Sequence, residues 1–220
     1  SGTAVNVSFN GSWGKQSPVG GGVTEVPAFG GDRTNYRFGV QARHSSLWEG
    51  IFLTETSLGV GASKNYATPY LDLPAGRVRV SSVFDDGSDG VQLLSFGGNP
   101  NMNTTQSTLG TAFQNQLSWF SKNNKHRLKL ATELRHELAD QSFATNHLGT
   151  FMYNSLADFE NNAPASFTRQ LSPREREVSQ VLVGISLGDS YRRTPNLQLT
   201  YGLRVDGATY FNTPLLNPSL

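Results

Sequence analysis

The chain has 220 residues, a formal net charge of +1 and a charged fraction of 16%, and glycine supplies 23 of its residues. The near-balanced charge excludes a highly charged disordered segment. It also shows no basic signature of a nucleic-acid-binding protein, so no nucleic-acid partner is expected. Apolar runs reach about five residues, far short of the roughly 18 that a membrane helix needs. Because cysteine is absent, disulfide frameworks and thiolate metal sites are excluded as well.

Apolar and polar side chains alternate from Val5 onward, which is the pattern of a strand with two different faces. In the first segment Val5, Val7 and Phe9 share one face, and polar residues occupy the other. The same period of two predicts seven strands, at about residues 5–13, 36–42, 48–60, 109–119, 127–138, 176–188 and 197–205. The last of these has the cleanest alternation.

Long and short connections alternate between the predicted strands. Long loops are expected at about 16–34, 61–108 and 139–174. Short turns are expected at about 44–47, 121–125 and 191–195. The long segments contain short strand-like pieces at 77–80, 91–94 and 151–153. Within the last loop, Ser155 followed by Asp158 resembles a capping box, which predicts a short helix.

The length of the strands and the alternation of long and short connections together predict the architecture. Strands of about 10 to 14 residues exceed the usual 5 or 6 of globular proteins and match a membrane-spanning strand. Short periplasmic turns that alternate with long extracellular loops are typical of an outer-membrane barrel. The fold class expected is therefore all-β, an antiparallel up-and-down transmembrane β-barrel segment. Aromatic residues near strand ends fit interfacial girdles; they are Trp13, Tyr36, Trp48, Trp119, Phe120, Tyr191, Tyr210 and Phe211.

Seven is an odd number of strands, whereas bacterial single-chain barrels have an even number. Residues 1–220 are therefore interpreted as part of a larger barrel. The N-terminus, which begins Ser1-Gly2-Thr3, has neither a basic nor an apolar region of a signal peptide, and this also favours a fragment. Soluble strands alternate too, so a soluble or surface-exposed β-rich binding or structural module stays open as the alternative.

In a large barrel the polar faces of the strands line a wet lumen, where opposite charges can pair. The candidate lumen-facing charged residues are Arg37, Arg43, Lys129, Glu133, Arg135, Glu137, Arg204 and Asp206. No catalytic, cofactor-binding or metal site is predicted, because the usual nucleophile, phosphate-binding and zinc motifs are missing. An enzyme is not expected.

An acidic stretch in the second long loop suggests either a turn or a calcium-binding loop. Asp85, Asp86 and Asp89 resemble half of a calcium-binding loop, but the twelfth position is Phe96 where a glutamate is needed. An Asp-Gly turn is favoured, and calcium binding is kept as a hypothesis.

Several segments resemble a known family, the TonB-dependent outer-membrane receptors. GTFMYNSLADF at 149–159 resembles a segment common in these receptors, and PNLQLTYGLR at 195–204 resembles a strand that follows a periplasmic turn. The stretches at 76–80, 96–99 and 123–129 are similar to the Oar-like branch. The resemblance covers about residues 35–216, and its most specific part is 109–210.

This resemblance implies a barrel of about 22 strands with a plugged lumen. It implies location in the cell outer membrane, contact with outer-membrane lipid, and ligand import driven through the TonB complex. The ligand would be a small molecule or a peptide. Neither a plug domain nor a TonB box matches any part of residues 1–220, so the resemblance transfers no binding residue.

Overall fold

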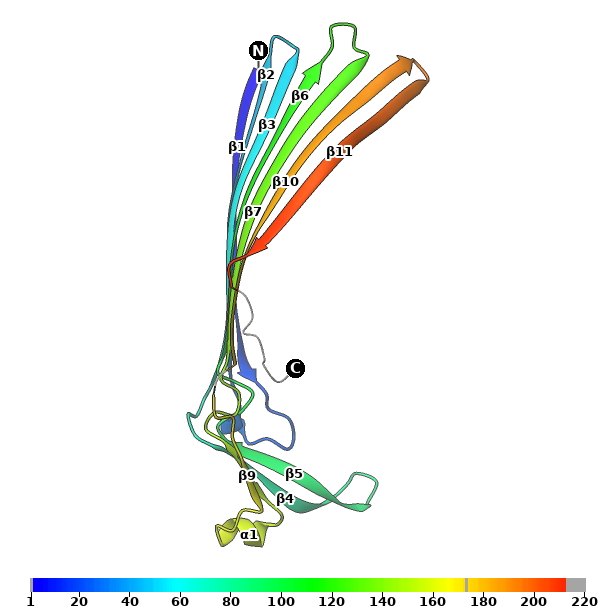
Figure 1. Cartoon of the computed structure of the whole chain (residues 1–220). Helices are drawn as coiled ribbons and strands as arrows, with labels where there is room; N and C mark the ends of the chain where they lie inside the picture. Colours follow the sequence, from blue (N-terminus) through cyan, green and yellow to red (C-terminus); the bar gives the residue numbers. More distant parts are fainter. Residues whose placement is uncertain (1, 173, 213–220) are drawn as a thin grey trace, which may run out of the picture.

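The computed structural model of the chain describes residues 2–172 and 174–212. Within this part, seven strands form one curved antiparallel sheet in the order β1-β2-β3-β6-β7-β10-β11 (Figure 1). Their bounds are Gly2–Val19 (β1), Gly31–Trp48 (β2), Phe52–Pro69 (β3), Thr104–Phe120 (β6), His126–Phe143 (β7), Arg174–Thr194 (β10) and Leu197–Tyr210 (β11). Each strand pairs with its neighbours in sequence among the long strands, so the sheet is an up-and-down meander, as predicted.

A smaller sheet lies at one end of the long strands (Figure 1). It has the order β5-β4-β8-β9. Its strands are Ala75–Val83 (β4), Asp89–Gly97 (β5), Thr150–Tyr153 (β8) and Ser166–Thr168 (β9), accompanied by the 3-10 helix Pro27–Phe29 (η1) and the helix Leu156–Glu160 (α1). None of the helices in the described ranges is long and apolar enough to span a membrane. We call this end of the molecule the long-loop end and the opposite end the short-turn end.

The pieces predicted inside the long loops are confirmed. The segments at 77–80, 91–94 and 151–153 lie in β4, β5 and β8. The helix α1 begins after Ser155, whose side-chain oxygen accepts a hydrogen bond from the Asp158 backbone N–H at 3.1 Å. This is the N-terminal half of the expected capping box.

The long strands extend further than the sequence predicts. Strands β1 to β10 of the large sheet have 17 to 21 residues, and the long connections shrink to 20–30, 70–103 and 144–173. The expected loop bounds 16–34, 61–108 and 139–174 were therefore too wide. The added residues are polar on both faces, as at Lys64 and Asn65, so they break the alternation while the backbone continues to pair.

Two of the three short turns are displaced from their predicted positions. The first lies at 49–51, because His44 to Trp48 stay paired in β2 and the chain reverses at Glu49 and Gly50, whose φ values are 50° and 67°. The last lies at 195–196, since β10 continues to Thr194. The middle turn lies at 121–125 as predicted.

The register of the sheet separates its side chains into two faces. One cross-strand row, which we assign to the apolar face, reads Val7, Ala42, Leu58, Phe113, Leu134, Val183 and Gly207. The adjacent row on the opposite, polar face reads Asn6, Arg43, Ser57, Gln114, Glu133, Gly184 and Asp206. Because directly paired residues of a sheet share a face, successive rows alternate between these two faces.

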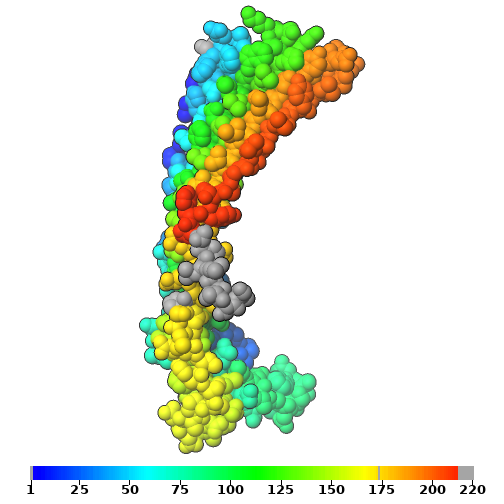
Figure 2. All heavy atoms as spheres, viewed as in Figure 1, coloured from blue at the N-terminus to red at the C-terminus, as the bar shows by residue number. Residues whose placement is uncertain are grey.

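The large sheet has no conventional core. Apolar-face residues such as Val5, Phe9 and Leu203 are 68%, 72% and 84% exposed. The buried apolar residues instead lie at or near the long-loop end: Phe29, Ala67, Ala75, Val78, Met102 and Tyr153. The space-filling view shows the same thin arc ending in this loop layer (Figure 2). A contiguous exposed apolar face of this size needs an apolar environment.

Aromatic residues border the apolar face at both ends. Trp48, Phe52 and Trp119 are paired in one row near the short-turn end, and Trp13 and Tyr36 are paired near the long-loop end. Trp48 and Tyr36 are twelve residues apart on β2. That separation is about 40 Å along a strand and about 30 Å through a membrane at the usual strand tilt of about 40°. The spacing matches the hydrocarbon thickness of a bilayer.

Candidate functional site

The polar face carries a cross-strand network of charges centred on Glu133 of β7. Its two carboxylate oxygens accept from Arg135 Nη2 at 2.8 Å and from Arg204 Nη2 at 3.1 Å. Arg204 on β11 also donates from Nε to both oxygens of Asp206, at 2.8 and 2.9 Å. Four of the eight charged residues singled out from the sequence thus form one cluster.

This network depends on a glycine in β10, the strand that lies between β7 and β11. Gly184 of β10 pairs with Glu133 on one side and with Asp206 on the other. A Cβ at Gly184 would lie 2.7 Å from Asp206 Oδ1 and 2.8 Å from Arg204 Nη2. The missing side chain lets Arg204 cross β10 and reach Glu133, which is a role that the sequence did not reveal.

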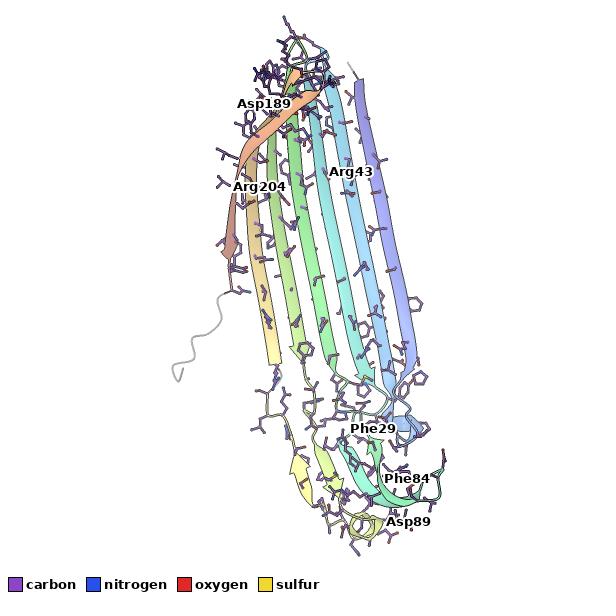
Figure 3. The ribbon with its side chains drawn as sticks, turned by 90° about the vertical axis from the view of Figure 1, so that its right-hand side faces the viewer. Phe29, Arg43, Phe84, Asp89, Asp189 and Arg204 are labelled. Atoms are coloured by element: carbon purple, nitrogen blue, oxygen red, sulfur yellow. The ribbon has the colours of Figure 1, made fainter. Side chains whose placement is uncertain are left out.

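A hollow of about 700 Å³ lies over the polar face beside this network. Arg43, Glu55 and Arg204 line it, and Glu55 accepts a hydrogen bond from Gln116 Nε2 at 2.8 Å. Arg43 on β2 and Arg204 on β11 lie at a similar height in the sheet, on opposite sides of the central strands (Figure 3). Glu55 went unnoticed in the sequence because the alternation of its strand is irregular.

Towards the long-loop end a second hollow, of about 510 Å³, has a row of glycines in its floor, with the Asn10 side chain lying over Gly39. Gly39, Gly61 and Gly110 are paired in one row across β2, β3 and β6. Two more of the predicted residues, Arg37 and Glu137, line this hollow together with Arg135 of the cluster. Such glycines leave room for another group to approach the sheet closely.

Towards the short-turn end Lys129 lines a smaller hollow of about 300 Å³ together with Arg127. The Arg127 guanidinium lies 5.1 Å from the centroid of the Phe120 ring. Arg127 was not among the candidates, although its position in the alternation places it on the same face as Lys129. All eight predicted residues therefore lie on the polar face. Seven of them line the three hollows, and Asp206 is paired with Arg204.

The apolar face also carries polar groups, among them a cluster around Asp189 of β10. Asp189 is 7% exposed, and its Oδ2 is 2.7 Å from His126 Nδ1 and accepts from the Tyr201 hydroxyl at 2.8 Å. The Tyr191 ring stacks on His126 with centroids 4.5 Å apart. Asp189 lies near the short-turn end (Figure 3). The sequence could have pointed to this cluster, because Asp189 is an acidic residue in the apolar phase of β10.

No group of three or more His, Asp or Glu residues with metal-binding geometry occurs in the described ranges. The acidic stretch at the tip of the β4–β5 hairpin forms a turn, in which Asp86 Oδ1 accepts from the Ser88 backbone N–H at 2.9 Å and from the Ser88 hydroxyl at 2.6 Å. These bonds to Ser88 lower the pKa of the Asp86 carboxyl. This geometry fits the Asp-Gly turn that the sequence favours at this position.

A two-faced antiparallel sheet with aromatic borders and a charged polar face defines a wall segment of an outer-membrane barrel. Comparison with protein families supports this class: the outer membrane beta barrel domain model matches residues 3–215. The chain belongs to that family, and its location is the outer membrane.

Among solved structures, the chain is similar to the Escherichia coli outer membrane transporter YddB. The TM-score is 0.56 and the sequence identity 14%, over 94% of this chain and 25% of that chain. The chain thus spans about a quarter of the length of that transporter, and the likeness concerns the fold. Comparison with curated protein sequences gives no significant match.

Proposed function

We propose that the chain is a wall segment of a TonB-dependent outer-membrane receptor that binds a ligand and imports it into the periplasm. The observation that carries the proposal is the polar face. Charged and amide side chains line three hollows on it, while the opposite face is apolar and suited to lipid. A wet, charged lumen inside an apolar wall is what a transporter of polar ligands requires.

The proposal treats the seven strands as part of a larger barrel of about 22 strands. In the described structure β1 and β11 each pair with one long strand only. A sheet edge in lipid would leave backbone groups unpaired, so further strands must close the wall. Large barrels of this kind enclose a plugged lumen, and the long-loop end would face the cell exterior. Assignment to the Oar-like branch rests on the sequence resemblance.

The ion-paired cluster at Glu133, Arg135, Arg204 and Asp206 supports binding rather than catalysis. These side chains neutralise one another and present hydrogen-bonding groups to the lumen, where a polar small molecule or peptide, or a lumen-filling domain, would contact them. The proposed partners are outer-membrane lipid, the TonB complex and this ligand. The soluble-module alternative loses support from the family match over residues 3–215.

The test uses the full-length parent protein in its own host. A deletion strain and the wild-type strain are grown on a panel of single nutrient sources, each with and without functional TonB. We expect a growth defect on at least one nutrient, and loss of TonB should reproduce it. In parallel, the detergent-purified parent should bind the periplasmic domain of TonB in a pull-down.

A parent protein that fails to bind the TonB domain, and whose deletion causes the same defect with or without TonB, would overturn the proposal. The matched control is a full-length Arg43→Gln, Arg204→Gln variant. It should still bind the TonB domain but take up the same nutrient less well, because the change affects only the wall.

A further inference from the structure

A fourth hollow lies on the apolar face, outside the charged face used in the proposed function. It measures about 540 Å³ and lies at the long-loop end of β2 and β3. The residues that line it include Tyr36, Lys64, Tyr66, Thr68, Asn103 and Thr105. Apart from Asn103, which follows the loop, these residues are in the phase of the apolar face.

Two tyrosines form one wall of this hollow. The Tyr36 and Tyr66 rings stack with centroids 6.1 Å apart at an interplanar angle of 25°, and their hydroxyls are 3.5 Å apart. The Lys64 Nζ lies 5.9 Å from the Tyr66 ring centroid. Lys64 is exposed, and no carboxylate in the described part of the chain lies within ion-pair distance of it. Its charge is thus available to a ligand.

The position of the hollow limits what can occupy it. Tyr36 pairs with Trp13 in the aromatic border at the long-loop end, so the hollow lies at the level of lipid headgroups rather than acyl chains. A cation at this level attracts headgroup phosphate. The Thr68 and Thr105 hydroxyls and the Asn103 amide can each donate and accept hydrogen bonds. This suits the hydroxyl groups of a sugar.

The other charged residues of this border indicate where along it an anionic headgroup would be favoured. Lys15 on β1 is ion-paired with Asp32 at 2.6 Å, whereas Lys64 has no carboxylate partner among the residues that the structure describes. In the same rows on β7 and β10 lie acidic residues instead, namely Asp140, Glu175 and Glu177. A phosphate is therefore favoured over β2 and β3 and disfavoured over β7 and β10.

We propose that this hollow binds the headgroup of a phosphorylated glycolipid of the surrounding membrane, with phosphate on Lys64 and sugar against Tyr36 and Tyr66. The site would fix the long-loop end of the wall to one leaflet. It is independent of ligand import, since it lies on the opposite face from the charged hollows.

The test titrates the full-length parent, purified in detergent, with lipid A, with dephosphorylated lipid A and with phosphatidylglycerol, and counts bound lipids by native mass spectrometry. We expect tightest binding of lipid A. Lys64→Gln should weaken it about fivefold, the effect of one cation near an anionic headgroup. The same variant should leave the weaker binding of dephosphorylated lipid A unchanged.

The matched control is Lys122→Gln, which removes an exposed lysine from the turn at 121–125 at the opposite end. It should bind lipid A as wild type does, and Lys64→Arg should restore binding if Lys64→Gln proves unstable. Equal lipid A affinity in Lys64→Gln and wild type would overturn the site. Phosphatidylglycerol binding as tight as lipid A binding would overturn the assignment to a glycolipid.

Discussion

Arg204 on β11 and Glu133 on β7 form an ion pair across an intervening strand, at 3.1 Å. The bridge is possible because Gly184 of β10, which pairs with Glu133 on one side and Asp206 on the other, carries no side chain in the path of the Arg204 guanidinium. A side chain at this position would occupy the space that the guanidinium crosses. The ion pair between Arg204 and Glu133 therefore links β11 to β7 across β10, and it depends on Gly184.

Replacing Gly184 with valine should break this contact and lower the thermal unfolding midpoint of the parent protein in detergent. The new Cβ would meet Asp206 Oδ1 and Arg204 Nη2 at under 3 Å, so both side chains must move. Gly207→Val is the matched control, because a Cβ at Gly207 meets nothing within 4 Å. Equal midpoints for the two variants would contradict the role assigned to Gly184.

The coupling between Glu133 and Arg204 should depend on salt. Their side chains are 24% and 53% exposed, so dissolved ions reach the pair and screen it. A double-mutant cycle with Glu133→Gln and Arg204→Gln, followed by thermal unfolding in detergent, should give a favourable coupling at low salt that shrinks at high salt. A coupling that stays constant from low to high salt would show that the pair is held by packing instead.

His126→Phe should destabilise the barrel more than His136→Phe does. Phenylalanine keeps the stacking on Tyr191, but it leaves the nearly buried Asp189 carboxylate with the Tyr201 hydroxyl as its main donor. The side-chain hydrogen bond of His136 in the described structure is to the Ser179 hydroxyl, at 3.1 Å, and involves no charged group. Adding Asp189→Leu to His126→Phe should recover stability, because an unpaired buried charge costs more than an apolar replacement. If the double variant unfolds earlier than His126→Phe, the carboxylate is not the source of the cost.

The isolated 220-residue chain should show no cooperative thermal transition in aqueous buffer. Its apolar face would contact water, with Leu203 and Val205 at 84% and 74% exposure, and so little apolar area is buried to offset the loss of chain entropy. Circular dichroism during heating is the measurement, and the full-length parent in detergent is the positive control. A sharp transition of the isolated chain in buffer would refute this prediction.

The sequence alone was sufficient to predict the two-faced sheet, the middle turn and the alternation of long and short connections. Side chains alternate strictly along a strand, so the apolar and polar phases of a segment such as 197–205 predict its faces directly. The same rule placed Arg204, Asp206 and Glu133 on one face. It was less reliable at strand ends, where residues such as Lys64 are polar in both phases and the alternation disappears before the backbone pairing does.

Only the tertiary structure decided which residues meet. The contact between Arg204 and Glu133 joins positions 71 residues apart, and the cluster of Asp189 with His126 spans 63. Such contacts depend on the register between strands, which turn positions set. Two of the three turns, at 49–51 and 195–196, differ from their predicted positions. The faces follow from local chemistry along each strand, whereas the neighbours across strands follow from where the chain reverses.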